Sequence, residues 1–167
     1  MSKQHIDGEI LTEEQLALLA AIQNRLIPAQ DEMPGAGDAG CASMLDRFLS
    51  ERAALRRPML AALNAIEAAA GERRQASAED DAASTYVAFL ALSDTERDEV
   101  LRAVELAHED LFSTLLNQTY TAYYTNPAVL LILGWNPPQP EGFPTPPPFD
   151  EALLAKVKQR GKIWRDA

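Results

Sequence analysis

Cysteine, histidine and long apolar runs are scarce in this chain of 167 residues, and each scarcity excludes a class of protein. The single cysteine, Cys41, cannot form an internal disulfide framework or a cysteine-rich metal or haem site. With two histidines and no HExxH pair, no helical metal motif is present. No run of about eighteen apolar residues occurs, so no membrane span is expected. We therefore expect no catalytic site, cofactor site or metal site in this chain.

Basic residues are also few. The chain has 15 Lys and Arg against 25 Asp and Glu, a formal net charge of −10. Because phosphate binding depends on clustered Lys and Arg, nucleic acid is not an expected partner. Alanine dominates the apolar residues and β-branched residues are few, which favours helices over sheets. The length suits one domain with a real hydrophobic core.

Start and stop signals divide most of the chain into helices. Capping boxes at Thr12–Gln15 and Ser93–Glu96 predict two helix starts. Asn126, followed by a proline, predicts the start of a short apolar helix, and Gly134 predicts its end. Asp110 is available as the N-cap of the helix before it, so residues 93–124 predict a helical pair.

Between these helices the pattern stays helical from Cys41 to about residue 70. Pro58 predicts a break or a new first turn within this stretch, and Gly71 predicts its end. Residues 71–82 are charged and poor in apolar side chains, which is typical of a surface connection. We therefore predict an all-α fold, an irregular bundle of about five to seven helices.

The loop at residues 27–40 is rich in Gly, Pro and Asp. Its glycines follow a helix rather than a strand, so they do not indicate a phosphate-binding loop. Asp31 and Glu32 lack the regular oxygen spacing of a calcium loop, which favours surface turn chemistry over metal binding.

A proline-rich segment follows the predicted bundle. Seven of the twelve residues from Pro137 to Pro148 are proline. We predict a helical domain at 1–136, and at 137–167 an extended arm with a short C-terminal helical segment. At about 3.1 Å per residue the prolines would span roughly 37 Å, enough to wrap a neighbouring subunit. The alternative is an arm that folds back over its own domain.

Two groups of aromatic residues are candidates for partner binding. Three tyrosines fall at i, i+3 and i+4 near a helix end, where core packing with one hydroxyl at the surface and a partner-facing patch both fit. A second group lies along the proline-rich segment. The predicted partner-binding residues are Tyr120, Tyr123, Tyr124, Trp135, Phe143, Phe149 and Trp164.

Several motifs, in order, resemble one family. The string LTEEQLALLAAIQNRLIPAQDEMPGAGDAG, the later YYTNP, then LGW and the proline-rich end are similar to the small-subunit family named after gluconate 2-dehydrogenase subunit 3. The resemblance covers most of the chain and is weakest across residues 56–92.

The resemblance implies a helical accessory subunit of a flavin-dependent dehydrogenase. The implied partner is an FAD-containing large subunit of the glucose–methanol–choline oxidoreductase type, which oxidises a sugar, sugar acid or polyol. In this family FAD and the catalytic residues belong to the large subunit, and an electron-accepting cytochrome is a further implied partner. We expect this chain to bind and stabilise that large subunit.

Two alternatives to an accessory subunit are open. An assembly or export chaperone would leave the flavoprotein once it holds FAD, whereas a stand-alone enzyme would turn over substrate without flavin. The family often supplies a twin-arginine export leader, and none is present here. We expect a cytoplasmic location, or a periplasmic one if a leader has been removed or is supplied by a partner.

Overall fold

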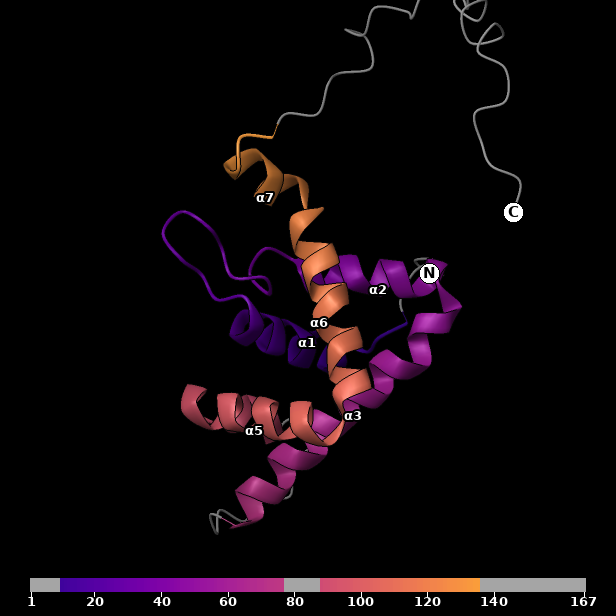
Figure 1. Cartoon of the computed structure of the whole chain (residues 1–167), viewed down its shortest axis with the longest axis vertical. Coiled ribbons are helices and arrows are strands. Elements are labelled where there is room, and N and C mark those ends of the chain that lie inside the picture. Colours follow the sequence, from indigo (N-terminus) through magenta and orange to yellow (C-terminus); the bar gives the residue numbers. More distant parts are fainter. Residues whose placement is uncertain (1–9, 77–87, 136–167) are drawn as a thin grey trace, which may run out of the picture. The chain divides into compact units, whose positions relative to one another are not determined.

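The computed structural model describes residues 10–76 and 88–135, and within these ranges it has seven helices and no named strand. The helices, most of them labelled in Figure 1, are α1 (Glu13–Leu26), α2 (Cys41–Glu51), α3 (Ala53–Ala76), α4 (Ala88–Ala91), α5 (Asp94–Ala107), α6 (Glu109–Tyr124) and α7 (Pro127–Ile132). The predicted all-α irregular bundle is confirmed. Residues 137–167 lie outside the described ranges, so the division into a helical domain and an arm stays a prediction.

The capping boxes act as predicted. The Thr12 hydroxyl accepts the backbone N–H of Gln15, and the Gln15 side chain accepts the backbone N–H of Thr12. Ser93 and Glu96 form the same reciprocal pair at the start of α5. Each pair satisfies N–H groups that have no partner inside the helix.

The predicted break at Pro58 is wrong: the helix breaks at Arg52, and Pro58 lies inside α3. The cause is a side chain that sequence periodicity does not reveal. Arg56 of α3 donates to the carbonyls of Leu49 (2.7 Å) and Ser50 (2.7 Å), which lie in the last turn of α2 and lack helical partners. The guanidinium therefore stabilises a helix end six residues before the proline.

Two further predicted boundaries are wrong. Gly71 lies inside α3, and its φ is not in the left-handed region that would end a helix, so residues 71–76 are helical. Asp110 is not an N-cap, because α6 begins at Glu109 after His108. His108 also ends α5, so the two helices share one capping residue and Asp110 falls in the first turn of α6. A carboxylate there still suits the helix dipole.

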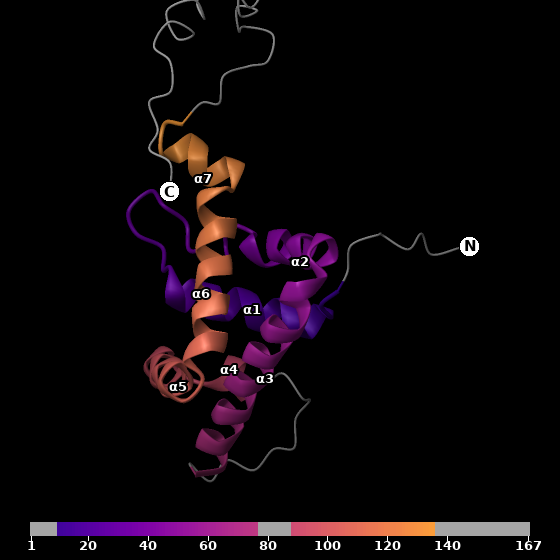
Figure 2. The same ribbon diagram turned by 45° about the vertical axis from the view of Figure 1, so that its right-hand side comes forward.

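The helix α6 runs through the middle of the fold (Figures 1 and 2) and packs against α2, α3 and α5. The main core contains buried side chains from α1 to α6, among them Leu18, Leu45, Leu63 and Phe89, all fully buried. A second, smaller core lies around the C-terminal part of α6 and the start of α7. In the part of the chain that the structure describes, no helix is both long and apolar enough to cross a membrane.

Two buried carboxylates hold irregular segments on the bundle. Asp46 of α2 accepts the backbone N–H groups of Ile10 (3.0 Å) and Leu11 (2.8 Å). Glu67 of α3 accepts the N–H groups of Ala88 and Phe89, the first two residues of α4. Both carboxylates are therefore structural, because each satisfies two backbone donors that would otherwise lack a partner.

An ion pair connects α1 to α5. The Arg25 guanidinium contacts both carboxylate oxygens of Asp98, at 2.7 Å and 2.8 Å, and donates a further hydrogen bond to Asp94 (2.8 Å). The hydrogen bond from Arg25, followed by its positive charge, lowers the pKa of Asp98. A bidentate pair of this kind fixes the angle between the two helices as well as their contact.

We expect this pair to stabilise the fold at neutral pH and to lose its effect in acid. Because the folded-state pKa of Asp98 is depressed, its contribution is complete above the unfolded-state pKa, about 3.9, and fades as the pH falls through the folded-state value. Asp98→Asn should lower the free energy of unfolding by about 0.5–1 kcal/mol at pH 7, since the pair is partly exposed. Urea unfolding at several pH values should show the difference from wild type shrinking below about pH 4. A difference that is constant with pH would contradict this assignment.

Candidate partner-binding surface at the α7 end

Two segments far apart in the sequence interlock at the junction of α6 and α7. The Tyr123 hydroxyl donates to the carbonyl of Pro34 (2.8 Å), and the Asn126 side-chain amide donates to the carbonyl of Ala39 (2.7 Å). The side-chain oxygen of Asn126 meanwhile accepts the N–H of Ala128 (2.9 Å) and so caps α7 as predicted. One buried asparagine therefore both starts α7 and ties it to the 27–40 loop.

The smaller core lies under this junction. It contains Ala36, Cys41, Ala122, Tyr123 and Val129, all buried. Burial raises the pKa of the Cys41 thiol and also the pKa of the Tyr123 hydroxyl. Tyr123 therefore stays protonated at neutral pH and remains a hydrogen-bond donor to the loop.

The end of α7 is fixed as firmly as its start. Gly134 has a φ of +74° and donates to the carbonyl of Leu131 (3.0 Å), while the N–H of Trp135 reaches the carbonyl of Leu130 (2.9 Å). These two bonds form a Schellman motif, which glycine favours because it adopts the left-handed conformation at little cost. The predicted role of Gly134 as a helix end is confirmed.

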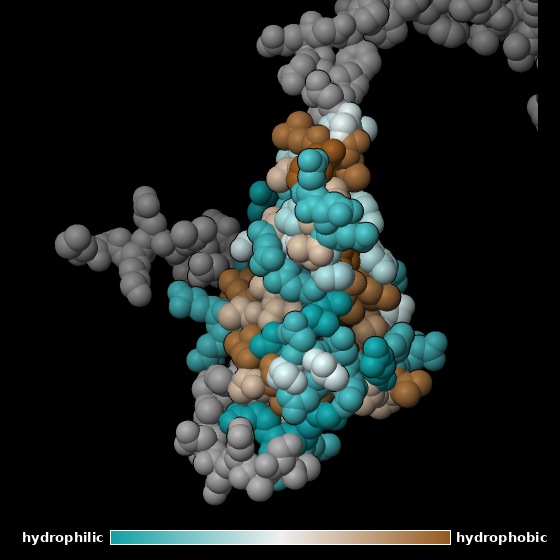
Figure 3. Space-filling view, turned by 90° about the vertical axis from the view of Figure 1, so that its left-hand side faces the viewer, coloured by the Kyte–Doolittle hydropathy of each residue, from teal (hydrophilic) through white to brown (hydrophobic). Residues whose placement is uncertain are grey.

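A six-residue helix made of Pro, Ala, Val, Leu and Ile cannot bury every side, and α7 exposes much of its apolar surface. We define the α7 surface as the large apolar and aromatic side chains at this end of the fold that are 42–66% exposed. They are Tyr120, Tyr124, Leu131, Ile132, Leu133 and Trp135. Figure 3 shows hydrophobic residues gathered at the α7 end of the described residues. Large exposed apolar side chains that gather in one region are typical of binding sites.

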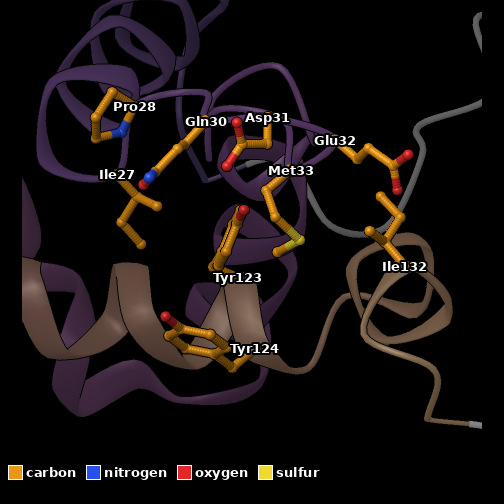
Figure 4. Close-up of a pocket in the computed structure, with 9 residues that line it drawn as sticks. All are labelled: Ile27, Pro28, Gln30, Asp31, Glu32, Met33, Tyr123, Tyr124 and Ile132. Carbon is orange, nitrogen blue, oxygen red and sulfur yellow. The ribbon is translucent and has the colours of Figure 1, made fainter.

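A cleft of about 620 Å³ lies between the 27–40 loop and the side chains of Tyr123 and Tyr124 on α6 (Figure 4). Gln30 and Met33 exchange two backbone hydrogen bonds, at 3.0 Å and 2.9 Å, so Asp31 and Glu32 lie at the tip of a tight turn. The cleft is lined by Ile27, Pro28, Gln30, Asp31, Glu32, Met33, Tyr123, Tyr124 and Ile132. The sequence interpretation of the two acids as surface turn residues agrees with this geometry.

The structure separates the three predicted tyrosines. Tyr123 is 2% exposed and belongs to the smaller core, whereas Tyr120 and Tyr124 are about half exposed. The Tyr123 and Tyr124 rings meet edge to face with centroids 5.2 Å apart. Trp135 lies at the end of α7 with half of its surface exposed. The predicted partner-binding residues Phe143, Phe149 and Trp164 lie outside the described residues, and a binding role for any of the seven stays a prediction.

Sequence reasoning overlooked three parts of this surface. The aliphatic residues Leu131, Ile132 and Leu133 were not among the predicted site residues, although an almost wholly apolar helix of six residues was the available signal. The loop–helix interlock and the cleft had no sequence signal, because they join residues nearly ninety positions apart. No three His, Cys, Asp or Glu side chains within residues 10–76 and 88–135 lie close enough to hold a metal ion.

Comparison with known proteins agrees with the resemblance seen in the sequence. Residues 13–142 match the family described as gluconate 2-dehydrogenase subunit 3. Neither the curated proteins nor the solved structures gave a match to this chain. The family match spans α1 to α7 and includes both of the segments that interlock around Tyr123 and Asn126. The chain therefore belongs to the gluconate 2-dehydrogenase subunit 3 family, whose name is that of one subunit of a dehydrogenase complex.

Proposed function

We propose that this chain is a non-catalytic accessory subunit that binds and stabilises the large subunit of an FAD-dependent dehydrogenase. The large subunit would be of the glucose–methanol–choline type and would oxidise a sugar, sugar acid or polyol. Family membership is the observation that carries the proposal. An electron-accepting cytochrome and a cytoplasmic location stay predictions.

The hydrogen bonds formed by four buried polar side chains support this proposal. Asp46, Glu67, Tyr123 and Asn126 are buried polar side chains, and each one holds a backbone segment through hydrogen bonds. These four side chains have structural roles, as the proposal of an accessory subunit expects.

The α7 surface supports binding of a second protein. Burying apolar area contributes about 25 cal/mol per Å². A partner that covers the half-exposed side chains of the α7 surface would therefore gain binding free energy. Tyrosine and tryptophan are also the residue types that dominate protein interfaces. We therefore assign the α7 surface as the part of the described chain that contacts the large subunit.

Co-expression with the candidate FAD-containing large subunit tests the proposal. We expect the two chains to co-purify at one to one, the complex to show a flavin absorption spectrum, and the isolated small subunit to be colourless and inactive. Leu131→Ser combined with Ile132→Ser should weaken co-purification, because both residues lie half exposed on the α7 surface. Leu106→Ser is the matched control, since Leu106 is an exposed apolar residue on α5.

Two outcomes would contradict the proposal. A large subunit that is equally soluble, stable and FAD-loaded without this chain would show that it does not stabilise its partner. If the chain were needed for assembly but absent from the mature enzyme, it would instead be an assembly chaperone.

A further inference from the structure

The cleft beside the α7 surface has two chemically different sides. On one side Asp31 and Glu32 stand at the tip of the turn, and within the described ranges neither carboxylate forms a hydrogen bond or an ion pair. On the other side lie the half-exposed ring of Tyr124 and the aliphatic side chain of Ile132 (Figure 4). The cleft therefore combines negative charge with an aromatic and aliphatic surface.

A cation carried on an apolar stem matches both sides. Unpaired carboxylates attract the charge, and the electron-rich face of a tyrosine ring attracts a cation within about 6 Å of its centroid. The stem can cover apolar side chains such as Ile27 and Met33 while its charged head reaches the acids. Arginine fits better than lysine, because the guanidinium group is planar and less strongly hydrated than an ammonium group. It can stack on aromatic rings and form paired hydrogen bonds with carboxylates.

Charge and position indicate which molecule supplies the cation. This chain carries a net charge of −10, so a second copy would approach the cleft with like charge overall. Tyr124 and Ile132 belong both to the cleft and to the α7 surface, so a protein that covers the α7 surface also reaches the cleft. We propose that the cleft receives an arginine side chain of the dehydrogenase large subunit. This proposal rests on the proposed function.

The cleft is formed before the partner arrives. The turn that carries the two acids is closed by the Gln30–Met33 hydrogen bonds, and the same loop is held by Tyr123 through the carbonyl of Pro34. Groups that are already in place need little ordering on binding, so more of the electrostatic attraction appears as affinity. The acids thus determine which partner surface fits, while the α7 surface supplies the apolar contact.

The test is the affinity of the full chain for the large subunit at two salt concentrations. Asp31→Asn combined with Glu32→Gln removes both charges at nearly constant size, and asparagine accepts the positive φ of Asp31 (+52°). The control, Glu51→Gln combined with Glu72→Gln, removes two exposed acids on α2 and α3 and gives the same net charge. By biolayer interferometry at about 50 mM salt we expect the cleft variant to bind about tenfold more weakly and the control within about twofold of wild type. At about 300 mM salt the difference should largely disappear through screening.

The outcomes separate the inference from the function on which it rests. A cleft variant that matches the control at both salt concentrations would overturn the arginine assignment, and the proposed function would stand if Leu131→Ser with Ile132→Ser still weakened binding. Wild-type chain that fails to bind the large subunit would overturn both. If sedimentation shows that the wild-type chain is a dimer and the cleft variant is a monomer, the occupant is a second copy of this chain. That result would also overturn the assignment.

Discussion

Gly37→Ala is expected to lower the free energy of unfolding by about 2–4 kcal/mol, because the added methyl group has no room. A Cβ at this position would lie 2.1 Å from the carbonyl oxygen of Ala20 and 2.8 Å from its carbon. Both atoms are backbone atoms of α1, so the clash cannot be relieved by a side-chain rotation. The 27–40 loop must move away from the helix or the helix must deform.

The effect of this substitution should reach α7. The loop is held on α1 by Asn24, whose side chain pairs with Asp38 through bonds of 3.0 Å and 3.1 Å. The same loop provides the Pro34 and Ala39 carbonyls that hold Tyr123 and Asn126. Displacing the loop should therefore also loosen the start of α7 and weaken binding of the large subunit.

A second glycine provides the control for Gly37. Gly71 lies inside α3, where an added Cβ would meet nothing within 4 Å. Gly71→Ala should raise the free energy of unfolding by about 0.5–1 kcal/mol, since alanine loses less backbone entropy in a helix. Urea unfolding of both variants measures the two effects. Equal stability of Gly37→Ala and wild type would show that Gly37 does not pack closely against the α1 backbone.

Glu67→Met is expected to destabilise the fold by about 2–4 kcal/mol, because it leaves one buried and one partly buried backbone donor without an acceptor. The carboxylate of Glu67 accepts the N–H groups of Ala88 and Phe89, and the Phe89 side chain is fully buried. At the other end of α4, Arg97 donates to the carbonyls of Phe89 (3.1 Å) and Leu90 (2.6 Å). A four-residue helix cannot hold itself, so side chains of α3 and α5 fix it at both ends.

Two further variants distinguish the role of Glu67 as a hydrogen-bond acceptor from a general effect of substitution in α3. Glu67→Gln keeps one acceptor oxygen and should cost less than Glu67→Met, whereas Glu72→Gln on the exposed part of the same helix should change the stability by no more than about 0.5 kcal/mol. Thermal and urea unfolding, with the m-value checked for constancy, give the ranking. A ranking in which Glu67→Met matches Glu72→Gln would contradict the assignment of Glu67 as the acceptor for α4.

Local signals in the sequence predicted the helices whose ends are decided by neighbouring residues. The Thr12 and Ser93 capping boxes and the Asn126 cap were predictable because each satisfies N–H groups within three positions along the chain. The break near Pro58 was misplaced because Arg56, a side chain of the next helix, stabilises the end of α2 through space. Gly71 was misread because a glycine ends a helix only when its φ becomes positive, which depends on its surroundings.

The fold class, the family resemblance and the short apolar helix near the end of the described residues could all be predicted from the amino-acid sequence. These follow from composition, from caps and from the order of motifs, all of which are local or linear properties. The packing of the helices was needed to show that Tyr123 is buried while Tyr124 is exposed, and that Asp31 and Glu32 line the same cleft as Tyr124. Burial depends on contacts such as Tyr123–Pro34 and Asn126–Ala39, and residues nearly ninety positions apart meet only once the helices have packed.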